Sequence, residues 1–254
     1  MLRADQRGPV LELTLDRPEV RNAINDELIA MLSETIRGAS EETRAIVIRG
    51  EGASFCAGGD LNWMRKAASY TVEENFQDAM KLAGLFEAMA TCPAVTIVRC
   101  HGAAFGGGSG LVAAADVAVA VEGTKFCFSE VKLGLIPATI SAVVLPKIGV
   151  GHSRHLFTTA EVFDAKRAYE IGLVHHVKDS LEAADAKINE LLSGILMNGP
   201  HAVHESKRLA VDYPLAIEET ARRLANIRAG DEGKEGVAAF LEKRPASYVV
   251  KLNS

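Results

Sequence analysis

The sequence predicts an α/β fold followed by a helical C-terminal part. Over the first two-thirds of the chain, short apolar segments of strand length alternate with segments whose apolar residues have helical spacing. Turns that contain glycine separate these segments. After Gly151 long amphipathic stretches dominate. The 254 residues are enough for one large domain. We divide it into an α/β core over residues 1–195 and a helical region over 196–254.

Composition excludes several classes of protein. Apolar residues make up 48% and charged residues 24%, which is typical of a globular chain with a buried core. The net charge is -5, and no run of lysines or arginines is long enough to follow a phosphate backbone, so we expect no nucleic-acid partner. No stretch approaches the roughly 20 apolar residues of a membrane span. The four scattered cysteines and the absence of a signal-peptide core predict a cytoplasmic location.

The first strand is expected at 10–15, where apolar and polar residues alternate until Asp16-Arg17-Pro18 ends the pattern. Asn25-Asp26-Glu27 then opens a helix, because short polar side chains favour the N-cap and acids favour the first turn. The apolar residues of this helix have helical spacing: Leu28, Met31, Leu32 and Ile36. A buried strand at 45–48 follows, and Arg49-Gly50 ends it.

The same order of elements returns in the middle of the chain. A helical stretch at 72–90 stops before Cys92-Pro93, and a second buried strand at 94–99 leads to a cluster of glycines at 106–108. The remaining expected elements are a buried helix at 111–115, a strand at 117–121, and helices at 164–171, 183–196 and 215–227.

Two glycine clusters, Gly58-Gly59 and Gly106-Gly107-Gly108, lie where a buried strand gives way to a helix. The first backbone N–H groups of a helix have no internal acceptor, and the helix dipole adds partial positive charge there. Glycine also lets a substrate oxygen approach the backbone closely. Each cluster can therefore supply one N–H to the same oxyanion. Either cluster alone is better explained as a tight turn, but two such junctions in one chain favour a function.

A dinucleotide-binding turn is a rival interpretation. The segment from Gly108 to Ala113 fits the pattern G-x-G-x-x-A after a strand, and Glu130 follows 20 residues after Gly110. A single match of this kind is weak evidence. It also lies in the middle of the chain and leaves Gly58-Gly59 unexplained, so we rank it below the oxyanion hypothesis.

Glu130 is the candidate acid–base residue. It lies between the aromatic-rich segment 125–128 and the apolar side chains of 131–136. Apolar surroundings raise the pKa of a carboxyl group toward the range that is useful for proton transfer at neutral pH. The alternative is an exposed glutamate on a bend between a strand and a loop.

Other reactive side chains form no recognisable site. The seven histidines show no metal-ligand spacing, so no metal site is predicted. Ser109 and Ser141 lack the G-x-S-x-G frame, which argues against a serine hydrolase.

With these motifs the chain resembles the crotonase family, also called the enoyl-CoA hydratase/isomerase family. The resemblance covers nearly the whole length, and the matching segments keep the order and spacing of the family. They are 15–18 (LDRP) with 21–23 (RNA), 54–61 (SFCAGGDL), 101–108 (HGAAFGGG), 115–116 (AD), 128–137 (FSEVKLGLIP), 172–174 (GLV), 235–236 (EG) and 240–244 (FLEKR).

The resemblance implies a crotonase-type spiral of strand–strand–helix units that assembles as a homotrimer or a dimer of trimers. It implies that the N–H groups of Gly59 and Gly107 form the oxyanion hole and that Glu130 is catalytic. The substrate would be an acyl thioester of coenzyme A, with no separate cofactor, and a basic residue near Lys243 would reach a ligand in a neighbouring subunit. Coenzyme A would lie along Arg21, Ala23, Ala57, Asp60 and Leu61.

One position departs from the family pattern. Well-known hydratases of this family carry two glutamates, whereas here the first position is Gly110 and only Glu130 remains. A single carboxylate can serve a hydratase if one water supplies both the hydroxyl and the proton. It also suits an isomerase, which lifts a proton from one carbon and returns it two carbons along.

Finer motifs resemble the methylglutaconyl-CoA and isohexenylglutaconyl-CoA hydratase branch, which serves leucine and acyclic terpene breakdown. These motifs are 60–64 (DLNWM), Gly110 and 129–140 (SEVKLGLIPATI). A hydratase for a branched or carboxylated 2-enoyl-CoA is therefore our first prediction. A delta isomerase and a non-catalytic acyl-CoA-binding scaffold are the alternatives. Arg65 and Lys66 are candidates to pair with a substrate carboxylate, although two solvated helix charges are the simpler interpretation.

Overall fold

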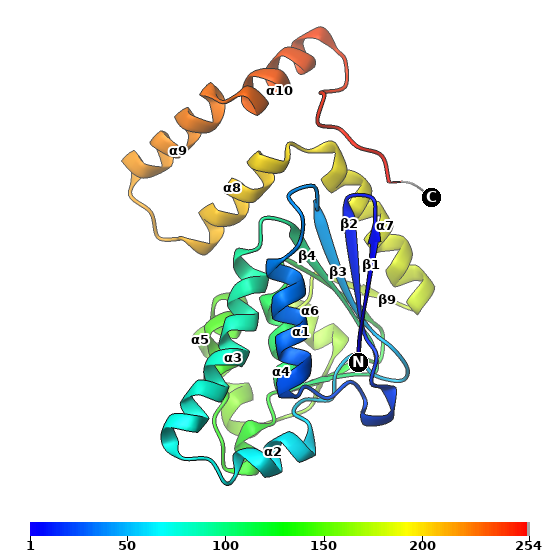
Figure 1. Ribbon diagram of the computed structural model, residues 1–254, viewed down its shortest axis with the longest axis vertical. Coiled ribbons are helices and arrows are strands. Elements are labelled where there is room, and N and C mark those ends of the chain that lie inside the picture. The colour runs from blue at the N-terminus through cyan, green and yellow to red at the C-terminus, as the bar shows by residue number, and fades with distance from the viewer. Residues whose placement is uncertain (253–254) are drawn as a thin grey trace.

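A six-stranded sheet forms the centre of the protein in the computed structural model, which describes residues 1–252 (Figure 1). All neighbouring strands of this sheet run parallel except the first pair, which is antiparallel. In spatial order the strands are β1 (Leu2–Arg7), β2 (Val10–Leu15), β3 (Ala45–Gly50), β4 (Val95–Cys100), β6 (Val117–Val121) and β9 (His176–Lys178).

Both faces of the sheet are covered, which is why its central strands are mostly apolar. On β3, Ile46 and Ile48 point into the core beneath the helices of one face, whereas Ala45 and Val47 point to the opposite face. The first layer consists of α1 (Asp26–Arg37), α3 (Val72–Thr91), α4 (Gly107–Ala114) and α5 (Ala138–Thr159). The opposite face is covered by α7 (Leu181–Met197).

A second, three-stranded sheet lies next to the first and carries segments of the candidate site. Its strands are β5 (Ala103–Phe105), β7 (Lys125–Cys127) and β8 (Phe163–Asp164), and α6 (Ala165–Glu170) follows it. Three short helical segments complete the core: η1 (Pro18–Val20), α2 (Leu61–Ala67) and η2 (Glu130–Leu133).

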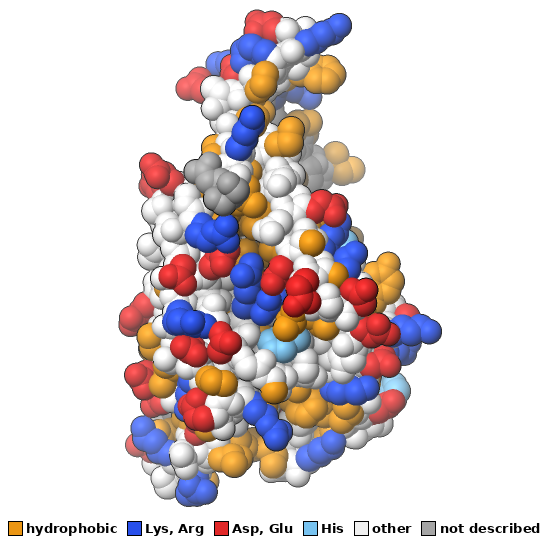
Figure 2. Space-filling view, turned by 90° about the vertical axis from the view of Figure 1, so that its right-hand side faces the viewer, with side chains coloured by type: hydrophobic (Ala, Val, Ile, Leu, Met, Phe, Trp, Pro, Cys, Tyr) orange, Lys and Arg blue, Asp and Glu red, His pale blue; other side chains and the backbone are white. Residues whose placement is uncertain are grey.

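The C-terminal helices extend away from the core (Figure 1). They are α8 (Pro200–Val211), α9 (Ile217–Ala229) and α10 (Asp231–Glu242). Lys207 of α8 holds them to the core, since its Nζ donates to Asp116 Oδ2 at 2.8 Å and to the Met89 carbonyl at 3.0 Å. Figure 2 shows charges of both signs over one side of the molecule, with apolar side chains among them on the extended part. Within residues 1–252 no helix is long and apolar enough to cross a membrane.

The predicted α/β core with a helical C-terminal part is confirmed. The helix α2 and the short strands of the second sheet were not predicted, because elements of few residues carry too little periodicity. The helices α8 and α10, of 12 residues each, were also missed; they bury at most one residue and so lack a clear core-facing pattern. Most of α5 was also missed, since Pro146 lies inside it and Gly149 breaks it with φ 73°. The division at 195/196 stays a prediction, and α7 continues through it to Met197.

Candidate active site

Three segments that are far apart in the sequence meet around a cavity of about 360 Å³. Gly59 reaches it from the loop before α2, Gly107 from the first residue of α4, and Glu130 from the start of η2. The rest of the wall is mostly apolar and includes Trp63, Met64, Leu82, Leu133, Leu135, Ile136 and Ile140. The structure thus brings together the three residues for which the sequence predicts a catalytic role.

Two backbone N–H groups of this wall have no backbone acceptor among residues 1–252. Gly107 is the first residue of α4, so its N–H has no acceptor inside the helix. The N–H of Gly59 donates to no backbone acceptor in residues 1–252. The position before α4, Gly106, has φ 46°, a left-handed conformation that glycine adopts without strain. Both N–H groups are therefore available to a ligand oxygen in the cavity.

The loop that carries Gly59 is held by backbone pairing with the segment after η1. The N–H of Ile24 donates to the Gly58 carbonyl at 2.7 Å, and the N–H of Asp60 donates to the Ile24 carbonyl at 2.8 Å. The N–H of Ala57 donates to the Arg21 carbonyl at 3.0 Å. These bonds on both sides of Gly59 fix the direction of its own N–H.

The Asp60 side chain anchors this loop. Its Oδ2 accepts from Arg17 Nη2 at 2.8 Å in an ion pair that is largely shielded from solvent. Its Oδ1 accepts from the backbone N–H of Asn62 at 2.8 Å and so caps α2. The hydrogen bond from the Arg17 guanidinium holds the pKa of Asp60 below its usual range. The Asp60 carboxylate is thus fully engaged within the protein.

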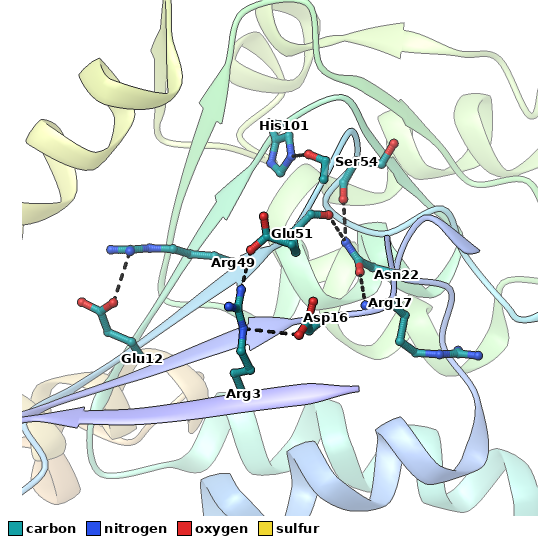
Figure 3. A network of polar contacts seen from close by, with 10 residues as sticks. Arg3, Glu12, Asp16, Arg17, Asn22, Arg49, Glu51, Ser54 and His101 are labelled. Atoms are coloured by element: carbon teal, nitrogen blue, oxygen red, sulfur yellow. Dashed lines mark hydrogen bonds and ion pairs between the residues drawn. The ribbon is translucent and has the colours of Figure 1, made fainter. Parts of the chain in front are cut away.

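A polar network supports the same loop further from the cavity (Figure 3). Asn22, which is fully buried, accepts from the backbone N–H of Arg17 and donates to the carbonyls of Glu51 and Ser54, each at 2.8 Å. On the outer side Arg3 forms ion pairs with Asp16 and Glu51. The loop from 51 to 60 is therefore tied down along its whole length.

Glu130 is half-buried, not exposed on a bend. Its Oε2 atom is shielded from solvent and has no hydrogen-bond partner among the described residues. Burial raises the pKa of this carboxyl group above its ordinary value of 4.5. Glu130 is the only residue lining this cavity whose side chain ionises as an acid or a base in the ordinary pH range.

No room is left for a second carboxylate at position 110. A Cβ atom on Gly110 would lie 2.6 Å from Phe86 Cζ and 2.7 Å from Ile140 Cγ2, which is closer than real Cβ contacts. Both neighbours are buried. Neither Phe86 nor Ile140 was singled out from the sequence, where their apolar spacing indicates only helix packing.

This packing predicts a clear difference between two Gly→Ala substitutions. Gly110→Ala should destabilise the protein by about 1–3 kcal/mol, because the added methyl group overpacks the core. Gly194→Ala is the matched control: it lies in α7 with no atom within 4 Å of the added Cβ, so it should stabilise the protein by up to about 1 kcal/mol. Denaturant unfolding of both variants measures the difference, and equal stabilities would contradict the packing described here.

The dinucleotide-binding interpretation is wrong. Gly108 and Gly110 lie inside α4 and are buried, not in a turn before a helix. A Cβ on Gly108 would lie 2.5 Å from the Cys56 carbonyl oxygen, so this glycine is needed for close packing of α4. The N–H of Gly110 already donates to the Gly106 carbonyl at 3.0 Å, and both glycines are packed against neighbouring residues, so neither is open to a phosphate.

The residues predicted to contact coenzyme A lie along two neighbouring segments. Arg21 and Ala23 belong to the first, and Ala57, Asp60 and Leu61 to the second, which pairs with it. Ala57 and Leu61 also line the cavity, and Leu61 is 75% exposed at its rim. Their contact with coenzyme A stays a prediction.

Arg65 and Lys66 do not line the cavity. Arg65 donates to Asn62 Oδ1, and Lys66 lies 3.6 Å from Asp26 on the exposed side of α2. In residues 1–252 no group of three or more His, Cys, Asp and Glu side chains could hold a metal ion.

Comparison with known proteins agrees with this arrangement. The sequence profile of the family described as "Enoyl-CoA hydratase/isomerase" matches residues 5–251. An enoyl-CoA hydratase of Alternaria alternata is 34% identical over 92% of this chain and 79% of its own length. The mitochondrial methylglutaconyl-CoA hydratase of Homo sapiens is 33% identical over 97% of this chain and 75% of its own.

A solved structure shows the same fold. The crystal structure of an enoyl-CoA hydratase from Shewanella pealeana is 37% identical and superposes with a TM-score of 0.93, covering 97% of this chain and 95% of that one. The profile, the relatives and the shared fold therefore give one conclusion: the chain belongs to the enoyl-CoA hydratase/isomerase family, with the crotonase-type fold.

Proposed function

We propose that this protein adds water across the Cα=Cβ bond of a 2-enoyl-CoA, with Glu130 as its only acid–base group. The observation that supports this most strongly is the convergence of Gly59, Gly107 and Glu130 on one apolar cavity. Free N–H donors can stabilise an enolate oxygen, and a carboxylate with a raised pKa can move the protons that hydration requires. Coenzyme A is part of the substrate, so the proposal uses no separate cofactor.

In this mechanism the thioester carbonyl accepts hydrogen bonds from the N–H groups of Gly59 and Gly107. Water attacks Cβ, the electrons of the double bond move into the thioester as an enolate, and Glu130 accepts the proton that water loses. Glu130 then gives a proton to Cα, the enolate collapses back to the thioester, and Glu130 is a carboxylate again. The two N–H groups act where negative charge develops, and one such donor is worth about 3 kcal/mol in comparable sites.

An isomerase with the same base is the second candidate, since a single carboxylate is the group that such a proton shuttle needs. The names of the protein's relatives favour hydration, because those from Alternaria alternata and Homo sapiens are called hydratases. A non-catalytic acyl-CoA-binding scaffold fits less well, since it gives no reason for a half-buried carboxylate with an unpaired oxygen.

The acyl group that we propose is branched or carboxylated, as in methylglutaconyl-CoA. The apolar wall of the cavity favours a branched hydrocarbon group. A distal carboxylate would need a cation to replace its hydration, and the sequence candidates Arg65 and Lys66 lie outside the wall. The two options are separated by comparing kcat/KM for two substrates. A higher value for 3-methylcrotonyl-CoA would indicate a branched hydrocarbon group, and a higher value for methylglutaconyl-CoA would indicate a carboxylated one.

A paired assay tests hydration against isomerisation. Purified protein receives a 2-enoyl-CoA in one run and its 3-enoyl isomer in another, and the ultraviolet absorbance of the conjugated thioester is followed. Hydration predicts that absorbance falls in the first run and that a 3-hydroxyacyl-CoA appears. A rise in the second run without incorporation of water from H₂¹⁸O would assign the isomerase activity instead.

For assembly we propose a homotrimer or a dimer of trimers built through the C-terminal helices. The extended α9 and α10 leave large apolar side chains exposed, which is costly for a monomer in water. These are Ile217, Leu224, Val237, Phe240 and Leu241. Phe240, at 82% exposure, has the largest side chain of this group.

Phe240→Glu should therefore shift the protein toward the mass of a single chain, because a charge would be placed at a contact that excludes water. Light scattering after size-exclusion chromatography measures the mass. A wild-type protein with the mass of one chain, or an unchanged mass in the variant, would contradict this proposed interface.

A further inference from the structure

The cavity holds few polar side chains besides Glu130. Those lining it are Ser129, Thr139 and Trp63, and the Trp63 indole N–H already donates to Asp78 Oδ1 at 3.3 Å. Position 110 cannot contribute a carboxylate, because Phe86 and Ile140 fill that space. Any second group that holds the attacking water must therefore come from this short set.

Ser129 Oγ and Glu130 Oε1 both lie close to Gly106 in the wall of the cavity. A Cβ placed on Gly106 would lie 3.4 Å from Glu130 Oε1 and 3.6 Å from Ser129 Oγ. The atoms nearest to that point are these two oxygens and the carboxyl carbon of Glu130, and the next residue, Gly107, starts α4 beside it. Two oxygens thus border one small volume next to the predicted oxyanion hole.

The Ser129 hydroxyl has no hydrogen-bond partner among residues 1–252. It occupies the N-cap position of η2, yet its side chain makes no capping hydrogen bond. Only its backbone carbonyl is engaged, accepting from the N–H of Lys132 at 3.0 Å. By contrast, Ser109 donates to the Ala104 carbonyl at 2.6 Å, and Ser141 donates to the Ala138 carbonyl at 2.7 Å.

We infer that Ser129 is a positioning residue which holds the attacking water together with Glu130. The inference rests on the hydration proposed above. A water molecule has two hydrogens to donate, and its attacking lone pair points at Cβ only when both are directed elsewhere. Glu130 accepts the hydrogen that is transferred, and Ser129 Oγ accepts the other, which stays on the new hydroxyl group. A hydroxyl oxygen can accept in this way without adding a second negative charge to the cavity.

The test compares hydration with a reaction that needs Glu130 but no attacking water. Glu130 can remove a Cα proton from a saturated acyl-CoA and return a deuteron from D₂O, with the same enolate as intermediate. Ser129→Ala should lower kcat for hydration of a 2-enoyl-CoA about tenfold, with unchanged KM, and leave the exchange rate within about twofold. Ser129→Thr retains the hydroxyl and should restore most of kcat. Ser141→Ala, outside the cavity, is the matched control.

The outcomes are distinct. Absence of hydration by the wild-type enzyme would refute the proposed function itself. Normal hydration by Ser129→Ala would overturn the role of Ser129 while leaving the proposed function in place. An equal loss of hydration and of exchange would also overturn the water-positioning role of Ser129. Ser129 would then support the position of Glu130 and not that of the water.

Discussion

Replacing Glu130 by Gln should lower kcat by about a thousandfold, within the range of 10²–10⁴ for the loss of an acid–base group. Glutamine keeps the size of the side chain and can still form hydrogen bonds, but it cannot accept and return a proton. We expect KM to change by less than about threefold, because no binding contact is removed. Steady-state kinetics with a 2-enoyl-CoA measures both constants, and normal turnover by the variant would show that Glu130 is not the base.

The raised pKa of Glu130 makes a second, independent prediction for this variant. The folded protein binds the Glu130 proton more tightly than the unfolded chain does, so stability falls as the pH rises through and above 4.5, the ordinary value of this group. At neutral pH the folded state therefore carries the cost of a half-buried charge, which Gln removes. Glu130→Gln should have a higher Tm than wild type at pH 8, and the difference should vanish below about pH 4.

The control for this pH dependence is an exposed carboxylate. Glu87→Gln, exposed in α3, should change neither kcat nor Tm at pH 8 noticeably. The same raised pKa predicts that wild-type kcat/KM, which reports ionisation of the free enzyme, declines on the acidic side with a midpoint above 4.5, since the base must be ionised. A Tm difference that grows toward low pH would contradict the burial of this charge.

Gly107→Pro should lower kcat by about a hundredfold to a thousandfold, the effect of losing one oxyanion donor. Proline has no N–H, and its ring would occupy the place where that N–H points into the cavity. The first position of a helix tolerates proline well, so α4 should still form. Circular dichroism checks the fold, and kinetics with a 2-enoyl-CoA measures the loss.

Gly107→Ala is the matched control because it keeps the N–H. Its Cβ would lie 3.0 Å from Ile24 Cδ1, the flexible end of a side chain that can move by a few tenths of an ångström. We expect the Ala variant to retain kcat within about tenfold, a cost below about 1.4 kcal/mol. If Ala and Pro reduced kcat equally, crowding at Gly107 and not the lost hydrogen-bond donor would explain the result.

Much of the fold could be predicted from local patterns in the sequence. The strand at 10–15 and the helix that begins after Asn25 appear at their expected places, because alternation and capping are properties of neighbouring residues. The start of α4 at Gly107, four residues before the expected helix, was hidden by glycines that disfavour helices in isolation. Packing of α4 between the sheet and α5 overrides that preference.

The sequence by itself determined the order of buried strands and helices, the two glycine clusters and a glutamate among apolar neighbours. Only the tertiary structure decided that Gly59, Gly107 and Glu130 line one cavity, and that Phe86 and Ile140 close the space at Gly110. It also decided that Ser129 Oγ and Glu130 Oε1 both lie close to Gly106. The physical reason is that periodicity reports which face of an element is buried, whereas a site depends on distances between segments that only packing brings together.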